Sequence, residues 1–297
     1  MHPAIPRIMK RFAHILGLSL LSVSLGNCSA DKPSPVARTG PASSVKTVAN
    51  TSYRTPVVRG PVPRNPDMNL PAGKPQGGGI SFSRVSVSSP YVAMTFDDGP
   101  HPQNTPRLLD MLRARNIKAT FYMIGANVEM YPDVVRRVAA EGHEIGVHTW
   151  DHRLLTKMGD DEVRSEISRT RDAIIRAAGV QPRTLRPPYG ALLQRQREMV
   201  YNEFGYPTIL WSVDPFDWKR PGPAVVTSRI LAGTTPGAIV LSHDLHSQTV
   251  DAMPATLDGL LRKGYRFVTV SQLLAMKGSA PTAPAVPVAA PTASLAE

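Results

Sequence analysis

Short apolar runs alternate with helix-like segments along most of this chain of 297 residues, and this alternation limits the fold more than any other feature. Seven runs have the length and composition of buried strands. The predicted strands cover residues 91–96, 119–124, 144–147, 184–186, 208–213, 238–242 and 265–268. Between them lie helical segments such as 160–178, which carries apolar residues at helical spacing and stops at Gly179. This order predicts an α/β fold with parallel strands.

Two parallel architectures fit the pattern: a β/α barrel and an open, doubly wound sheet. Strands such as 238–241 are apolar throughout, as expected where helices cover both faces of a sheet. No glycine-rich phosphate loop follows the first predicted strand, so the sequence does not support the dinucleotide-binding form of the open sheet.

The N-terminal 30 residues have the features of an export signal. A basic start precedes an apolar stretch that is too short to be an obvious membrane span. Cleavage after Ala30 is one expectation. The other is a lipoprotein-type signal, in which Cys28 becomes the lipid anchor. Cys28 is the only cysteine, so no intramolecular disulfide can form. We therefore expect an exported protein, periplasmic or associated with the cell envelope, with or without a lipid anchor.

The flanks differ from the centre in composition and charge. Residues 31–83, basic and rich in Pro and Ser, predict a disordered linker, and residues 278–297, rich in Ala and Pro, a disordered tail. Residues 84–277 then form one domain of ordinary size. Residues 1–80 hold 10 Lys/Arg and 2 Asp/Glu, a balance of +8, and the remainder holds 24 and 21, a balance of +3. A nearly balanced domain argues against a folded surface for nucleic acid.

Two adjacent carboxylates, Asp97 and Asp98, stand where the first predicted strand gives way to Gly99-Pro100. Neighbouring strand residues point to opposite faces, so both aspartates can face one site only if the chain turns there. Two like charges side by side need a cation, a partner or a proton to compensate them. A solvated turn is the alternative, because Asp-Asp-Gly-Pro is good turn chemistry.

Four further polar clusters follow the ends of predicted strands. They are His148-Thr149-Trp150-Asp151-His152, Arg186-Pro187-Pro188-Tyr189-Gly190, Asp214-Pro215-Phe216-Asp217-Trp218 and Leu241-Ser242-His243-Asp244. In a β/α barrel the C-terminal ends of the strands form the face that carries the active site. The spacing of four between His148 and His152 allows both rings to lie on one side of a helical turn or a tight loop.

Two imidazoles and one carboxylate suit a divalent first-row metal and leave positions open for water and substrate. A non-haem iron oxygenase uses the same ligand types. Nothing in the sequence suggests a site for its redox co-substrate, so metal-assisted hydrolysis is favoured.

The motifs TFDDGP, HTWDH, RPPYG, DPFDW and LSH, in this order, resemble the five motifs of the polysaccharide deacetylase family, the NodB-homology group or carbohydrate esterase family 4. The resemblance covers about residues 88–277. It implies a distorted (β/α) barrel with about seven strands. It also implies a hydrolase that removes acetyl groups from N-acetylated sugars of an envelope or extracellular polysaccharide, with one divalent metal ion, usually zinc.

The resemblance implies a role for each matching residue. Asp98, His148 and His152 would hold the metal. Asp97 would be the general base that takes a proton from water, and His243 the general acid that gives one to the leaving amine. With an ordinary pKa of ~6.5, a histidine can be protonated near neutral pH.

Five further residues complete the set that the resemblance implies. Arg186 would orient Asp97, and Asp217 would orient His243. The backbone N–H of Tyr189 would help to bind the oxyanion, and Trp218 and Leu241 would line the pocket for the acetyl methyl group.

Two alternatives remain open on sequence alone. One is a metal-dependent amidase that acts on a small molecule. The other is a catalytically inactive carbohydrate-binding module, although no metal ligand is missing. The acetylated polymer is undetermined among peptidoglycan, chitin-like oligosaccharide, exopolysaccharide and O-acetylated xylan, and so is the choice between N- and O-deacetylation.

Overall fold

The computed structural model describes residues 62–66 and 79–277. The predicted export signal with Cys28, most of the predicted linker and the predicted tail lie outside these residues. Among the helices of the described part, none is long and apolar enough to span a membrane.

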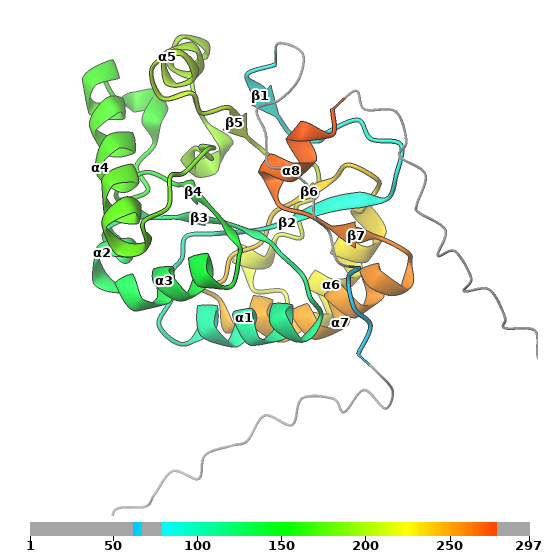
Figure 1. Cartoon of the computed structure of the whole chain (residues 1–297). Helices are drawn as coiled ribbons and strands as arrows, with labels where there is room; N and C mark the ends of the chain where they lie inside the picture. The colour runs from blue at the N-terminus through cyan, green and yellow to red at the C-terminus, as the bar shows by residue number, and fades with distance from the viewer. Residues whose placement is uncertain (1–61, 67–78, 278–297) are drawn as a thin grey trace, which may run out of the picture. The chain divides into compact units, whose positions relative to one another are not determined.

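Strands and helices alternate along the described chain (Figure 1). The strands are β1 (Ser81–Phe82), β2 (Tyr91–Asp97), β3 (Thr120–Met123), β4 (Glu144–Val147), β5 (Thr208–Ile209), β6 (Ile239–Val240) and β7 (Arg266–Phe267). The helices are α1 (Asn104–Ala114), α2 (Gly125–Met130), α3 (Pro132–Ala140), α4 (Asp160–Ala178), α5 (Gln194–Phe204), α6 (Pro223–Gly233), α7 (Ser247–Arg262) and α8 (Val270–Ala275). Short 3-10 helices are η1 (Leu155–Lys157), η2 (Pro188–Gly190) and η3 (Asp217–Lys219).

β2 is the central strand. It pairs in parallel with β3, β6 and β7, and β3 pairs in parallel with β4. β1 pairs in parallel with β5. Single-residue bridges continue the order, from Val147 through Leu185 to Thr208 and from Val213 to Val240. All pairings between the seven strands are parallel, and the one antiparallel bridge in the described residues joins Arg84 to Ala238. The fold class, an α/β fold of the distorted barrel type, is confirmed.

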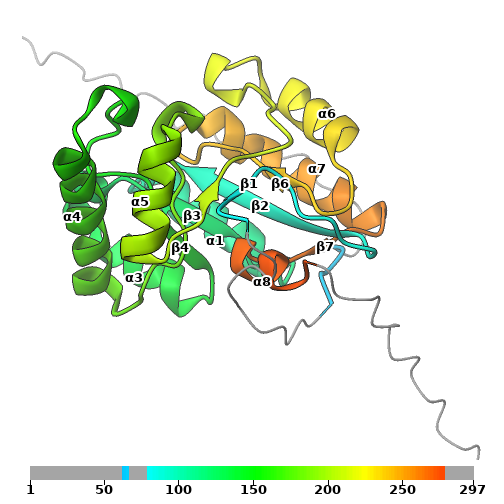
Figure 2. The same ribbon diagram turned by 90° about the horizontal axis from the view of Figure 1, so that it is seen from above.

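Helices cover the outside of the strands. In the view of Figure 2, α3, α4 and α5 lie on one side of the strands and α6 and α7 on the other. α4 illustrates how sequence sets these elements: its first turn is acidic, with Asp160, Asp161 and Glu162, which suits the positive end of the helix dipole. It ends at Gly179, whose left-handed φ of 70° closes the helix without steric cost.

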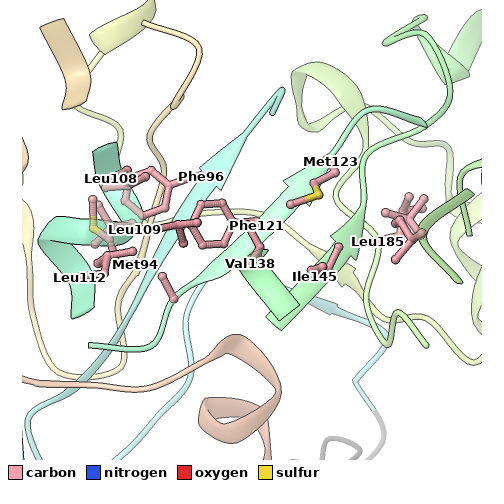
Figure 3. Close-up of a cluster of buried hydrophobic side chains, with 14 of the residues drawn as sticks. Met94, Phe96, Leu108, Leu109, Leu112, Phe121, Met123, Val138, Ile145 and Leu185 are labelled. Atoms are coloured by element: carbon pink, nitrogen blue, oxygen red, sulfur yellow. The ribbon is translucent and has the colours of Figure 1, made fainter. Parts of the chain in front are cut away.

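Alternation along β2 and β3 divides the side chains between two environments. Val92, Met94 and Phe96 join the larger apolar cluster, together with Phe121 of β3. Figure 3 shows Met94, Phe96 and Phe121 within it. The rings of Phe96 and Phe121 lie with centroids 5.3 Å apart. Ala93 of β2 and Tyr122 of β3 alternate with these residues and point to the opposite, inner side of the strands. There they belong to a second apolar cluster. Because the period is two, Asp97 also points to that inner side.

The elements differ from the predicted ones at several places. The strand expected at 184–186 is reduced to a bridge at Leu185, because Pro187 and Pro188 have no N–H to continue a ladder. β1 and helices α2, α5 and α6 were not predicted. β1 lies within the predicted linker, and its residue Phe82 is buried, so packed structure begins ahead of residue 84.

Candidate active site

The two aspartates at the end of β2 face one site because the chain turns between them. Asp97 is the last residue of β2, and Asp98 has a left-handed φ of 71°. Both side chains line the same pocket. The chain therefore makes the turn that two adjacent aspartates need in order to face one site.

Asp98 and two histidines form a group that could hold a metal ion. The candidate ligand atoms of Asp98, His148 and His152 lie within 4.8 Å of one another. Oδ1 of Asp98 is 3.3 Å from Nε2 of His148 and 3.3 Å from Nε2 of His152. The histidines come together through a tight loop, not a helical turn, in which Trp150 N–H donates to Glu166 of α4 (2.8 Å).

The surroundings of these three residues fit a cation. Nδ1 of His148 lies 2.7 Å from the carbonyl oxygen of Arg186, so the ring donates its Nδ1–H there and keeps the Nε2 lone pair for a ligand bond. Oδ1 of Asp98 is buried and has no hydrogen-bond partner among the described residues. A buried carboxylate oxygen without a donor is costly, and a metal ion would satisfy it.

Burial and neighbouring charges set the protonation of the three candidate ligands. Burial would raise the pKa of Asp98, but the close contact with His148, whose charge acts together with those of His243 and His152, lowers it to about 2. Burial and the charge of His148 lower the pKa of His152, which favours its neutral, ligating form. The pKa of His148 is raised because the Asp97 and Asp98 carboxylates outweigh its burial. A cation bound here would therefore displace a proton from His148.

Arg186 is fully buried below the pocket and holds Asp97 in place. Its Nη1 donates to Oδ1 of Asp97 (2.7 Å) and lies 2.6 Å from Oγ1 of Thr95. Its other nitrogens donate to the carbonyls of Ile209 (3.3 Å) and Leu210 (3.1 Å). Every side of the guanidinium is satisfied, as a buried charge requires. The second carboxylate oxygen of Asp97, Oδ2, is not the one bonded to Arg186, and it lies 3.8 Å from Nε2 of His148.

A second acid–histidine pair, Asp217 and His243, stands across the pocket. Oδ1 of Asp217 accepts from Nδ1 of His243 (2.9 Å), and Oδ2 accepts from His243 N–H (2.8 Å) and Thr249 O–H (2.8 Å). This arrangement fixes the His243 ring and leaves Nε2 for the pocket. Burial lowers the pKa of His243, but the hydrogen bond and charge of Asp217, with the charges of Asp97 and Asp98, raise it to about 9.

A pocket of about 410 Å³ joins these groups. Eight of the ten predicted site residues line this pocket: Asp97, Asp98, His148, His152, Tyr189, Trp218, Leu241 and His243. The remaining two, Arg186 and Asp217, lie behind the wall and touch Asp97 and His243. The structure thus brings all ten together.

Several other residues belong to this region, although no role was predicted for them from the sequence. Trp211, Pro187 and Asp214 also line the pocket. Thr95 and Thr249 bond to Arg186 and Asp217. The position of Thr95 beside the site could have been predicted, since Thr95 lies two residues before Asp97 and shares its face of the strand.

Asp244, which belongs to the predicted polar cluster 241–244 but had no assigned role, is also part of this region. It is fully buried and bonded to the hydroxyl of Thr105. A Cβ added at Gly99 would meet its Oδ1 at 2.6 Å, so only glycine fits next to Asp98. Burial raises the pKa of Asp244 to about 7.

Unusual backbone conformations gather around the pocket. Seven described residues other than glycine have a positive φ, and six lie in the loops of this rim. They are Asp98, Thr149, His152, Tyr189, Phe216 and Arg220. Such conformations cost about 1 kcal/mol or more each and cluster at functional sites.

Comparison with known proteins agrees with this geometry. The family model described as polysaccharide deacetylase matches residues 84–209. A peptidoglycan-N-acetylglucosamine deacetylase of Bacillus cereus is 39% identical over 225 residues, which cover 71% of this chain and 81% of that protein. The crystal structure of a peptidoglycan N-acetylglucosamine deacetylase has a TM-score of 0.62 at 38% identity and covers 65% of this chain and 91% of that one.

A second relative is longer than this chain. The peptidoglycan-N-acetylglucosamine deacetylase PgdA of Listeria monocytogenes is 45% identical over 186 residues, which make up 63% of this chain and 39% of that protein. The match thus spans about two fifths of the length of the Listeria protein. Motifs, fold, pocket and relatives agree, and the chain belongs to the polysaccharide deacetylase family.

Proposed function

We propose that this protein is a metal-dependent hydrolase that removes acetyl groups from N-acetylated sugars of a cell-envelope polysaccharide and releases acetate. The observation that carries the proposal is that a candidate metal group, a buried carboxylate and a positioned histidine face one another in one pocket. Amide hydrolysis needs an activated water, a stabilised oxyanion and a proton for the leaving amine, and the pocket offers a group for each.

Asp97 is proposed as the general base. Arg186 occupies its Oδ1, so the carboxylate presents Oδ2 to the pocket and can take a proton from water there. The buried ion pair fixes the carboxylate before substrate arrives, which is the preorganisation that catalysis requires.

His243 is proposed as the general acid. The charge of Asp217 favours the imidazolium, so a proton is held on Nε2 at neutral pH and can pass to the leaving nitrogen. Asp217 is then a positioning residue that acts through His243.

Asp98, His148 and His152 are the proposed metal ligands, and zinc is the proposed ion. When bound, a divalent cation supplies Lewis acidity toward the acetyl carbonyl and lowers the pKa of water. The backbone N–H of Tyr189, held in a left-handed conformation (φ 59°), is the proposed oxyanion donor. Trp218 and Leu241 supply apolar walls for the acetyl methyl group.

Peptidoglycan is the proposed polymer, since the relatives compared above act on it by name. The predicted export signal agrees with an envelope substrate. We further propose that the catalytic domain corresponds to about residues 84–277 and that Cys28 is a candidate lipid anchor.

An acetate-release screen tests the function. Purified protein is assayed on peptidoglycan, chitin-like oligosaccharide, exopolysaccharide and O-acetylated xylan, with and without a chelator. We expect acetate from an N-acetylated glycan, loss of activity with the chelator, and recovery with added metal. No acetate from any polymer would refute the proposal.

Metal content provides an independent check. His148→Ala should lose metal and activity together, since one of three ligands is gone. His246→Ala is a matched control: this histidine stands near His243 but outside the pocket, and the variant should keep its metal. Full activity of metal-free protein would contradict the assignment.

A further inference from the structure

The loop of residues 214–220, beside the pocket, carries two exposed aromatic rings, those of Phe216 and Trp218. Of the aromatic side chains that the structure describes, three are exposed: Tyr189, Phe216 and Trp218, at 68%, 41% and 50%. Tyr189 and Trp218 line the pocket, and the Phe216 ring lies 6.3 Å from Trp218, centroid to centroid. Exposed aromatic rings are unfavourable in water, so their grouping at one pocket mouth indicates a surface for ligand.

The same loop carries uncompensated positive charge. Nζ of Lys219 lies 4.8 Å from the Trp218 ring centroid and 5.0 Å from that of Phe216. Arg220 follows it and is exposed, and the guanidinium of Arg229 lies 5.6 Å from the Phe216 ring. Within residues 62–66 and 79–277, no carboxylate forms an ion pair with any of these three cations, whereas many other arginines of the domain are paired.

The loop is held in a defined conformation. Phe216 and Arg220 have left-handed φ values of 54° and 53°, which are unfavourable for such side chains. Phe216 N–H donates to Oδ1 of Asp214 (2.7 Å), and Arg220 N–H donates to the carbonyl of Asp217 (2.8 Å). These bonds hold the chain in a conformation that presents the rings and cations outward.

Charge is divided between the pocket and its rim. Asp97, Asp98 and Asp214 line the pocket, which therefore suits the neutral acetamido group better than an anion. Lys219 and Arg220 stand outside it. A glycan that placed an acetamido group in the pocket and a carboxylate on the rim would match both regions.

We infer that Phe216, Trp218, Lys219 and Arg220 form a subsite for a carboxylate of the glycan, so that the protein prefers acidic N-acetylated glycans to neutral ones. This inference rests on the proposed deacetylase function. In a peptidoglycan strand the carboxylate has two sources, the lactyl ether of alternate sugars and the attached peptide. Both offer the same chemistry to the cations.

The test compares four N-acetylated substrates. They are a neutral N-acetylglucosamine tetramer, glycan strands with lactyl carboxylates and no peptide, the same strands with those carboxylates methylated, and strands that carry peptides. The readout is the kcat/KM for acetate release on each acidic substrate divided by that on the neutral tetramer.

For the wild type this ratio should exceed one and fall as salt is raised, because exposed charges are screened. The double variant Lys219→Gln, Arg220→Gln should lower the ratio about five- to twentyfold, mainly through KM, as two exposed cations are removed. Lys263→Gln is the matched control, since this exposed lysine caps the far end of α7, about 24 Å along the helix axis from Ser247. Its ratio should equal that of the wild type.

The comparison among the three acidic substrates identifies the source of the carboxylate. Loss of the preference on methylated strands assigns the lactyl group, and a preference found only on strands with peptides assigns the peptide. A ratio unchanged in the double variant, or a wild type without preference, would overturn the subsite while leaving the deacetylase function intact. Absence of acetate from all four substrates would instead remove the proposed function and the subsite with it.

Discussion

At the scale of single residues, the site depends on charges that are buried and fully partnered. Arg186 contacts Asp97, Thr95 and two backbone carbonyls, and it stacks on Tyr122, 4.3 Å from the ring centroid. A buried ion pair gains little stability over apolar residues, because both charges lose water. Its value here is geometric: it fixes one oxygen of Asp97 and leaves the other for chemistry.

The Asp217–His243 pair makes a prediction about pH. The negative charge of Asp217 raises the pKa of His243, so activity that needs the imidazolium is present below that pKa, about 9, and is lost as pH rises through it. Asp217→Asn removes the charge, and the basic limb of the kcat/KM profile should move to lower pH by about 1–2 units. Thr249→Val, which removes only one bond to Asp217, should move the limb less. An unmoved limb in Asp217→Asn would show that His243 is not the group being titrated.

At the scale of elements, the ends of parallel strands carry the chemistry and the glycines between them allow close approach. Gly237, just before β6, is the tightest case. Its φ is +78°, and a Cβ there would lie 1.7 Å from the carbonyl oxygen of Val85. Its N–H and carbonyl bond to Tyr91 and Val85, so this turn ties β6 to the start of β2.

Gly237→Ala should therefore destabilise the fold by about 3 kcal/mol or more, because backbone atoms cannot move aside cheaply. Gly264→Ala is the control. Gly264 has a similar φ of +85° but nothing within 4 Å of its Cβ position, so only the conformational cost of about 1–2 kcal/mol applies. Equal losses in the two variants, measured by chemical denaturation, would contradict this account.

Elements with strong local signals were predictable from the sequence. β4 and α4 begin and end where the pattern predicted, because an apolar run and an acidic start with a glycine stop determine them locally. The strand at Leu185 was predicted too long, since its extent depends on neighbours and on two following prolines. β1 has only two residues, and its partner β5 is distant in sequence, so no local pattern marks it.

The site, like the secondary structure, could be predicted from the sequence in part. The paired aspartates, the two histidines and His243 stand out because their residue types and positions after strands are unusual. Trp211 does not stand out, because only the folded chain brings it to the pocket wall. The subsite cations, Lys219 and Arg220, look like ordinary surface charge until their neighbours are known.

At the scale of the whole molecule, the segment ahead of residue 84 contributes to the packed structure. Asn65 is buried, and its amide exchanges two hydrogen bonds with Phe267 of β7 (2.8 and 3.0 Å). Its N–H donates to the carbonyl of Arg115 (2.8 Å). Phe82 of β1 packs in the inner apolar cluster.

A chain of residues 62–277 should therefore be more stable than one of residues 84–277. Burial of Phe82 contributes about 2 kcal/mol, and each hydrogen bond of Asn65 contributes about 1 kcal/mol. Denaturant unfolding of the two chains measures the difference, which should be about 3 kcal/mol or more. Asn65→Ala in the longer chain separates the share of Asn65 from that of Phe82. Equal midpoints for the two chains would mean that the segment only rests on the surface.

Asp97 is proposed to handle the proton, whereas Asp98 and the two histidines are proposed to hold the metal. The most direct test is Asp97→Asn, assayed for acetate release from an N-acetylated glycan and for bound metal in the same preparation. We expect one metal ion per chain, as in the wild type, with acetate release reduced about 10²- to 10⁴-fold. Acetate release close to that of the wild type, with the metal still bound, would contradict the proposed role of Asp97.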